Sequence, residues 1–217
     1  MRFVLGLNLY RYSMLRSETF LLETGPLATP SNRADNQRYQ DLLDAAQSLY
    51  YELPYDQVTI ERVAHTASLS LGVAQRILGS PEVMLRGVIT RGIARLQKAF
   101  FYRNPLQTDP ESLRTGIQLL LDDVFAVIAQ DISFWKLYFF IRKDADLQAL
   151  LAKELQEFDI FLNLQISSCF RRLQTPSPND TTARFRNRIR ILMQDLLYTH
   201  QEDQISRQGK LLVSEFM

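Results

Sequence analysis

Residues 59–78, TIERVAHTASLSLGVAQRIL, constrain the fold most, because they predict two short helices joined by a tight turn. Thr59 and Ser70 each precede a helical pattern of apolar residues. Their hydroxyl groups can accept hydrogen bonds from the free N–H groups in the first turn of a helix. Small residues where two helices cross and a polar cap on the second helix are typical of a helix-turn-helix. Ala64, Ala67 and Ser70 supply both.

The segments on either side of this motif predict two further helices. Residues 36–52 place apolar side chains three and four positions apart, which is the spacing of one helical face. After the motif, Ser80 is placed to cap a helix, Pro81 occupies its first position and Glu82 lies in its first turn. This helix is expected to continue to about residue 101. Residues 36–103 are therefore predicted to form one four-helix unit.

Short sequence matches within this unit point to a known family. Residues 55–59, YDQVT, enter the first helix of the motif, and Val63 and Ala64 follow within it. Residues 68–70, SLS, stand where the family has a Gly-Val-Ser turn, and residues 79–82 match the start of its next helix. The run from residue 38 to residue 88 thus resembles the DNA-binding domain of the TetR (tetracycline repressor) family of transcriptional regulators. The resemblance implies a homodimer that binds a palindromic operator in double-stranded DNA and carries a second, helical, ligand-binding domain.

The second helix of the motif departs from the family pattern. The family usually reads Lys-Gly-Thr-Leu-Tyr-x-His-Phe, whereas this chain reads LGVAQRIL at residues 71–78. Readout of bases is still expected, because Gln can bind adenine and Arg can bind guanine in the major groove. The predicted DNA-binding residues are Thr59, Thr66, Ser70, Leu71, Gly72, Val73, Gln75 and Arg76.

The charge of the predicted unit leaves a second hypothesis open. Between residues 38 and 90 there are four arginines and six acidic residues, so the net charge is 4 − 6 = −2, whereas the whole chain carries +1. Lys and Arg contacts to phosphate supply most non-specific affinity for DNA. The alternative is a TetR-like helical dimer that has lost DNA binding and works as a protein-partner or ligand-binding protein. Its apolar contact patch would consist of Leu71, Val73, Ile77 and Leu78.

The remaining sequence predicts an all-α chain. Residues 1–35 read as an amino-terminal extension and linker, and whether Met1 or Met14 is the true start stays open. Pro and Asn residues near 104–110 mark a boundary. Residues 111–217 are expected to form the helical ligand-binding and dimerisation domain. Its predicted helices are 111–130, 132–142, 147–173, 181–200 and 204–216, with a loop at 175–180.

Two further sites are predicted in this second half. The aromatic run at residues 134–140 could line a pocket for a small apolar or aromatic effector, although plain core packing is the favoured explanation. The candidate pocket residues are Trp135, Tyr138 and Phe139. The candidate dimer-interface residues on the next-to-last helix are Leu192, Met193, Leu196 and Leu197.

Several classes of function are not expected. The single cysteine, Cys169, and the two histidines, His65 and His200, form no pattern of metal ligands, so we expect no metal site. The chain has no phosphate-binding loop or nucleophile motif, so we expect neither enzyme activity nor a cofactor. It also lacks an apolar run of about 18 residues, and we expect a cytoplasmic protein. The effector, the operator, the regulated genes and the choice between repressor and activator stay open, with repression the expected mode.

Overall fold

The computed structural model describes residues 33–102, 110–199 and 201–216, and every regular element within these ranges is a helix, which confirms the predicted all-α class. The predictions for residues 1–32 lie outside this part of the chain. The helices are α2 (Arg33–Glu52), α3 (Ile60–Thr66), α4 (Leu71–Leu78), α5 (Pro81–Tyr102), α6 (Pro110–Gln130), α7 (Ile132–Ile141), α8 (Ala145–Leu150), α9 (Ala152–Arg172), α10 (Pro178–Tyr198) and α11 (Ile205–Phe216), with short 3₁₀ helices η1 (Tyr55–Gln57) and η2 (Glu202–Gln204).

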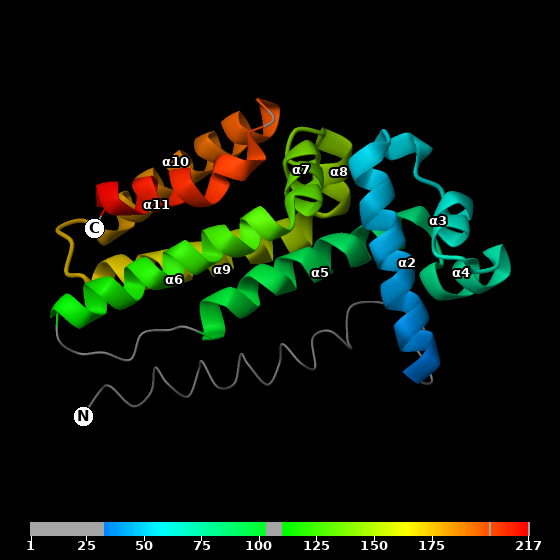
Figure 1. Cartoon of the computed structure of the whole chain (residues 1–217), viewed down its shortest axis with the longest axis horizontal. Coiled ribbons are helices and arrows are strands. Elements are labelled where there is room, and N and C mark those ends of the chain that lie inside the picture. Colours follow the sequence, from blue (N-terminus) through cyan, green and yellow to red (C-terminus); the bar gives the residue numbers. More distant parts are fainter. Residues whose placement is uncertain (1–32, 103–109, 200, 217) are drawn as a thin grey trace.

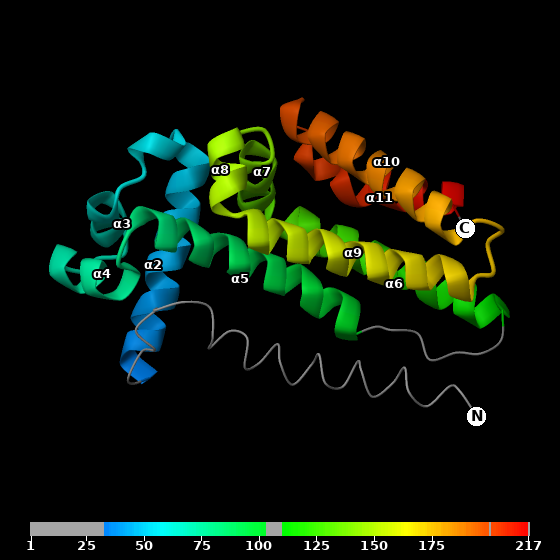
Figure 2. The ribbon, with the colours of Figure 1, turned by 180° about the vertical axis from the view of Figure 1, so that it is seen from behind.

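The helix-turn-helix lies at one end of the molecule and the long helices α6, α9, α10 and α11 lie at the other (Figure 1). The α5 helix joins them, because it packs against α2 and α4 and also against α6 and α9. The α7 helix lies between the two ends and packs on α2, as the reverse view also shows (Figure 2). The end that holds α3 and α4 is thus connected to the helical body through α2, α5 and α7.

The predicted helix caps are present. The Thr59 Oγ1 atom accepts a hydrogen bond from the Arg62 amide at 3.3 Å, and the Ser70 Oγ atom accepts one from the Val73 amide at 3.4 Å. Ser80 caps α5 in the same way, through the Val83 amide at 3.3 Å. The α4 helix ends at Gly79, whose φ of 73° suits a residue without a side chain. Local hydrogen bonding therefore sets the limits of α3 and α4.

Apolar side chains fix α3 and α4 against α2 and α5. Burying such side chains stabilises the fold by about 1.5–3 kcal/mol for each large aliphatic residue. The fully or almost fully buried residues of this core are Leu42, Leu43, Ala46, Val63, Ala64, Ala74, Leu78, Met84, Leu85 and Val88. The small side chains Ala64 and Ala74 allow α3 and α4 to cross closely, as the motif requires.

Two glycines allow aromatic rings to rest directly on helix backbones. A Cβ atom at Gly92 of α5 would lie 2.1 Å from ring atoms of Phe134, and one at Gly209 of α11 would lie 2.3 Å from the ring of Phe125. Both phenylalanines are 1% exposed. Helices α5 and α7, and helices α6 and α11, therefore approach each other at distances that only glycine permits.

A polar network ties α2 and α5 to the residues that join α6 and α7. The side-chain amide of Gln47 donates to Asp131 and, at 2.9 Å, to Ser133. Arg95 forms an ion pair with Asp131 at 2.7 Å, and Arg91 donates to the Gln47 side-chain oxygen at 3.2 Å. Gln47 is buried, and its side chain has partners both in α5 and at the start of α7. This network therefore favours one relative position of α2, α5 and α7.

Two predicted boundaries are corrected by the structure. The segment 147–173 was expected to be one helix, but Leu151 interrupts it with φ −108° and ψ 17°, which leaves α8 and α9 as separate helices. Leu151 is completely buried, so tertiary packing outweighs the helical pattern at this position. The second correction is at α10, which begins at Pro178 within the predicted loop, because proline suits the first turn of a helix.

Within the described ranges, no single helix is long and apolar enough to cross a membrane. Helices α6 and α7 pass that test only as a pair, by length and composition, and a bend of 88° separates them.

Candidate nucleic-acid interface

The α4 helix has one buried and one exposed face. Ala74 and Leu78 are buried and Val73 and Ile77 are half-buried, so these four residues form the inward stripe. The opposite face has the same spacing along the helix and consists of Leu71, Gly72, Gln75 and Arg76. All four are exposed. The helix therefore presents a continuous surface that contains two side chains able to bind base edges.

Three of the other predicted DNA-binding residues lie at the ends of α3 and α4. Thr66, at the end of α3, is exposed. Thr59 and Ser70 are exposed too, although their hydroxyl oxygens accept the capping hydrogen bonds described above. Val73 differs from the rest because it is half-buried and belongs to the inward stripe. Seven of the eight predicted residues are thus exposed, and Val73 is turned partly into the core.

Gly72 leaves the middle of the exposed surface open. A Cβ atom built at this position would have no neighbouring atom within 4 Å. Glycine inside a helix costs about 1 kcal/mol relative to alanine, so its presence here does not help the helix itself. An open backbone at this point allows another molecule to approach α4 closely.

Arg76 makes a two-point ion pair with Asp35, a residue that the sequence had placed in the amino-terminal linker. One terminal nitrogen of Arg76 lies 3.2 Å from Asp35 Oδ2 and the other lies 3.1 Å from Oδ1. Arg38 adds a contact to Oδ1 at 3.1 Å. The hydrogen bond from Arg76 is the largest influence that lowers the pKa of Asp35 below its usual value, so the carboxylate is ionised at neutral pH. An acidic residue in the first turn of a helix was visible in the sequence, but its partner 41 residues away was not.

The apolar patch required by the alternative hypothesis does not form on α4. Leu71 is 40% exposed, whereas Leu78 is 1% exposed. Val73 is half-buried and Ile77 packs against the core. One exposed leucine is ordinary on a protein surface.

The aromatic residues predicted to face an effector are packed against each other. Trp135 is 6% exposed and Tyr138 is 7% exposed, with their ring centroids 5.4 Å apart and Phe158 5.8 Å from Tyr138. The Tyr138 hydroxyl oxygen accepts hydrogen bonds from Arg142 at 2.8 and 3.0 Å, so its polar atom has a partner. Phe139 is half-buried beside them. Trp135 and Tyr138 are therefore packed as core residues in this structure, and a ligand pocket at these residues stays a prediction.

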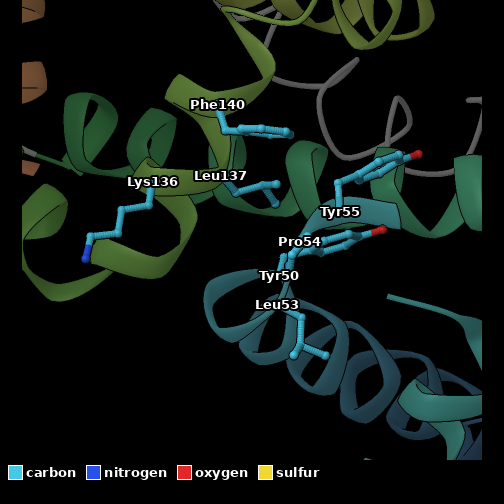
Figure 3. A pocket seen from close by; sticks show the side chains of 7 residues that line it. All are labelled: Tyr50, Leu53, Pro54, Tyr55, Lys136, Leu137 and Phe140. Atoms are coloured by element: carbon cyan, nitrogen blue, oxygen red, sulfur yellow. The ribbon is translucent and has the colours of Figure 1, made fainter. Parts of the chain in front are cut away.

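A small pocket opens instead on another side of α7, at its contact with the end of α2 (Figure 3). Its volume is about 190 Å³, below the roughly 300–1,000 Å³ of pockets that hold drug-sized ligands. Tyr50 and Tyr55 stack with nearly parallel rings on one wall, and Leu137 and Phe140 form the other. The side-chain nitrogen of Lys136 points away from the pocket and lies over the ring of Tyr51. The walls are thus mainly apolar and aromatic.

The residues predicted for a dimer interface point mostly into the chain itself. Met193, Leu196 and Leu197 are 1%, 3% and 8% exposed, and Leu192 is partly buried against the core. The three buried side chains pack within the chain itself, and a dimer interface at these residues stays a prediction. The apolar residues that α10 and α11 leave exposed are Ile191, Tyr198 and Leu211.

Comparison with solved structures identifies the architecture. The fatty acid degradation regulator FadR from Bacillus halodurans superimposes with a TM-score of 0.67 at 14% identity, over 82% of this chain and 97% of that protein. The repressor SmeT of the Stenotrophomonas maltophilia multidrug efflux pump SmeDEF gives 0.65 at 14% identity, over 82% and 87%. This chain has a TetR-like fold. A TetR-like transcriptional regulator from a Rhodococcus species agrees, with a TM-score of 0.61 and 16% identity over 81% and 93%.

Sequence comparison adds nothing to this likeness: no family model and no curated protein matches the chain. The structural match covers almost the whole of the TetR-like regulators, which places the motif and the helical body of this chain in the TetR-like order. At such low identity the likeness concerns the fold.

Proposed function

We propose that this protein is a DNA-binding transcriptional regulator of the TetR type, which acts as a homodimeric, ligand-responsive repressor. The exposed surface of α4 carries the proposal. It places Gln75 and Arg76 on the second helix of a helix-turn-helix, with the open Gly72 backbone beside them. In such motifs the second helix enters the major groove and its exposed side chains read base edges.

The dimer part of the proposal follows from the geometry of DNA. Two recognition helices must meet successive major grooves about 34 Å apart, which a two-fold dimer of this chain achieves. Exposed apolar side chains on α10 and α11 support that arrangement. Ile191 and Leu211 are 51% and 52% exposed, and Tyr198 is 62% exposed. These helices lie at the end of the molecule away from α4, so pairing them leaves α4 free (Figure 1).

The ligand response is proposed to act at the junction of α2, η1 and α7. The pocket between Tyr50, Tyr55, Leu137 and Phe140 is lined by the motif-bearing end on one side and by the helical body on the other. Its aromatic walls favour a small neutral aromatic or aliphatic molecule. Such a molecule changes DNA binding only if its affinity differs between two relative positions of α2 and α7.

The first test is selection of DNA fragments from the genome of origin by the purified full-length protein at two salt concentrations. Recovery of a palindromic site, with binding that weakens as salt rises, is the expected result. A folded protein that enriches no fragment at either salt concentration would contradict the proposed function.

The matching mutational test is Arg76→Ala. Loss of a two-point contact to a base costs about 1–3 kcal/mol of binding free energy and relaxes the choice of base at one position of each half-site. Fluorescence anisotropy with the selected duplex and with base-substituted duplexes measures both effects. Arg114→Ala, which removes an exposed arginine from α6, is the matched control and should bind as the natural protein does. Unchanged affinity of Arg76→Ala would show that Arg76 does not read DNA.

A further inference from the structure

The guanidinium group of Arg76 is already occupied in the structure. Both of its terminal nitrogens lie within 3.2 Å of the two carboxylate oxygens of Asp35. The Arg76 side chain is 57% exposed, whereas the Asp35 side chain is 9% exposed. The carboxylate is therefore held among the helices, and the arginine lies over it from the solvent side.

This contact uses one of the two N–H pairs with which an arginine can recognise a base, the pair on its two terminal nitrogens. Arginine binds guanine by directing two N–H groups at the O6 and N7 atoms, and it binds a carboxylate by directing two N–H groups at the two oxygens. In the observed geometry one N–H from each terminal nitrogen is given to Asp35. Arg76 cannot present that pair of N–H groups to a base until it leaves the carboxylate.

We propose that Asp35 is a latch residue: it competes with DNA for Arg76 and thereby sets how tightly the recognition helix binds. This inference rests on the proposed DNA-binding function. Charge supports the competition in two further ways. The carboxylate also holds Arg38 at 3.1 Å, so it engages two arginines at once. It also adds one negative charge to a unit that is already −2 between residues 38 and 90, and phosphates repel that charge.

The ion pair between Asp35 and Arg76 is formed at neutral pH. Hydrogen bonding from Arg76 and Arg38 lowers the pKa of Asp35, so the carboxylate stays ionised throughout the range in which DNA binding is measured. A lowered pKa means that protonation releases the pair only in acid, below the ordinary value of 3.8. The contact is therefore broken by exchange of partners, and not by a change of pH near neutrality.

The test is Asp35→Asn in the full-length protein, which keeps the shape of the side chain and removes its charge. The expected result is DNA binding that is about three- to tenfold tighter than that of the natural protein, both to the selected duplex and to the pooled genomic fragments. Asp41→Asn is the matched control, because it removes one charge from the same helix and its carboxylate contacts Gln37 in place of an arginine. The control should bind within about twofold of the natural protein.

A double variant separates the latch from a general gain in charge. Combining Asp35→Asn with Arg76→Ala should abolish the gain, because the released Arg76 supplies it. A gain that persists in the double variant would assign the effect to Arg38 or to net charge and would overturn the latch. Circular dichroism melting of every variant establishes that binding is compared between folded proteins.

The possible failures are distinguishable. If the natural protein selects a DNA site but Asp35→Asn binds equally well or more weakly, the latch is wrong and the regulator remains. If neither protein enriches any fragment, both the latch and the proposed function fail. If only Asp35→Asn enriches fragments, the latch is supported, whereas the natural protein fails the selection test and the proposed function is contradicted.

Discussion

Ser68 lies in the turn between α3 and α4 with a φ angle of 55°, a backbone conformation that favours glycine. The TetR pattern has glycine at this position, and this chain has serine. A residue with a Cβ atom in the left-handed region costs about 1–2 kcal/mol, so the turn is formed at an energetic disadvantage. The packing of α3 and α4 on α2 offsets it.

Ser68→Gly should therefore stabilise the protein. The gain is expected to be about 1 kcal/mol, which corresponds to a rise in Tm of about 2–4 °C for a chain of this size. Thermal unfolding followed by circular dichroism measures it. Gly79→Ala is the opposite control, because Gly79 has a φ of 73° and space around its Cβ position, so only backbone strain should lower its Tm. A lower Tm for Ser68→Gly would mean that the serine side chain contributes more than its conformation costs.

At the scale of the helices, α5 and α7 are in close contact where the Phe134 ring rests on Gly92. The contact lies beside the polar network of Gln47 and Asp131, so an apolar and a polar contact together fix α7 against α2 and α5. Packed interiors yield little when volume is added. The relative position of α5 and α7 therefore depends on one residue, Gly92, that carries no side chain.

Gly92→Ala should destabilise the protein by about 1–3 kcal/mol, because the new methyl group would overlap the Phe134 ring. Gly92→Ala combined with Phe134→Leu should recover part of this loss, since the smaller side chain makes room. Urea unfolding of both single variants and the double variant gives the interaction free energy. Additive effects in this double-mutant cycle would show that the ring moves aside without cost.

The elements also show what the sequence could and could not predict. The caps at Thr59, Ser70 and Ser80 were predictable, because each depends on residues within one helical turn. The break at Leu151 was not, because the local pattern continues through it and only burial against other helices ends α8 there. The partner of Arg76 was missed for the same reason, since Asp35 meets it only once α2 and α4 are packed together.

At the scale of the whole molecule, the end proposed to read DNA and the end proposed to pair with a second copy are far apart in sequence and in space (Figures 1 and 2). Helices α2, α5 and α7 connect them. Because the whole chain has a net charge of only +1, its long-range attraction to DNA is weak, and the proposed binding would depend on the local arrangement at α4.

Ile191→Asp should convert the proposed dimer to a monomer without unfolding it. Ile191 is 51% exposed on α10, so the charge is tolerated in one chain but is costly when buried between two. Sedimentation velocity should show the change in mass, and affinity for a palindromic duplex should fall with it. Leu119→Asp is the matched control, because Leu119 on α6 is also 51% exposed. A dimer that survives Ile191→Asp, or one that is lost on Leu119→Asp, would place the interface elsewhere.

The two contacts between glycine and phenylalanine bear on how relatives of this protein can be recognised. Aliphatic core residues exchange for one another at little cost, which allows overall identity to fall to 14–16% while the fold is kept. Positions 92 and 134, and positions 209 and 125, lack that freedom, because a larger residue at the first requires a smaller one at the second. We therefore expect each pair of positions to change together or not at all in other sequences with this packing, so that a change at one position predicts a change at the other.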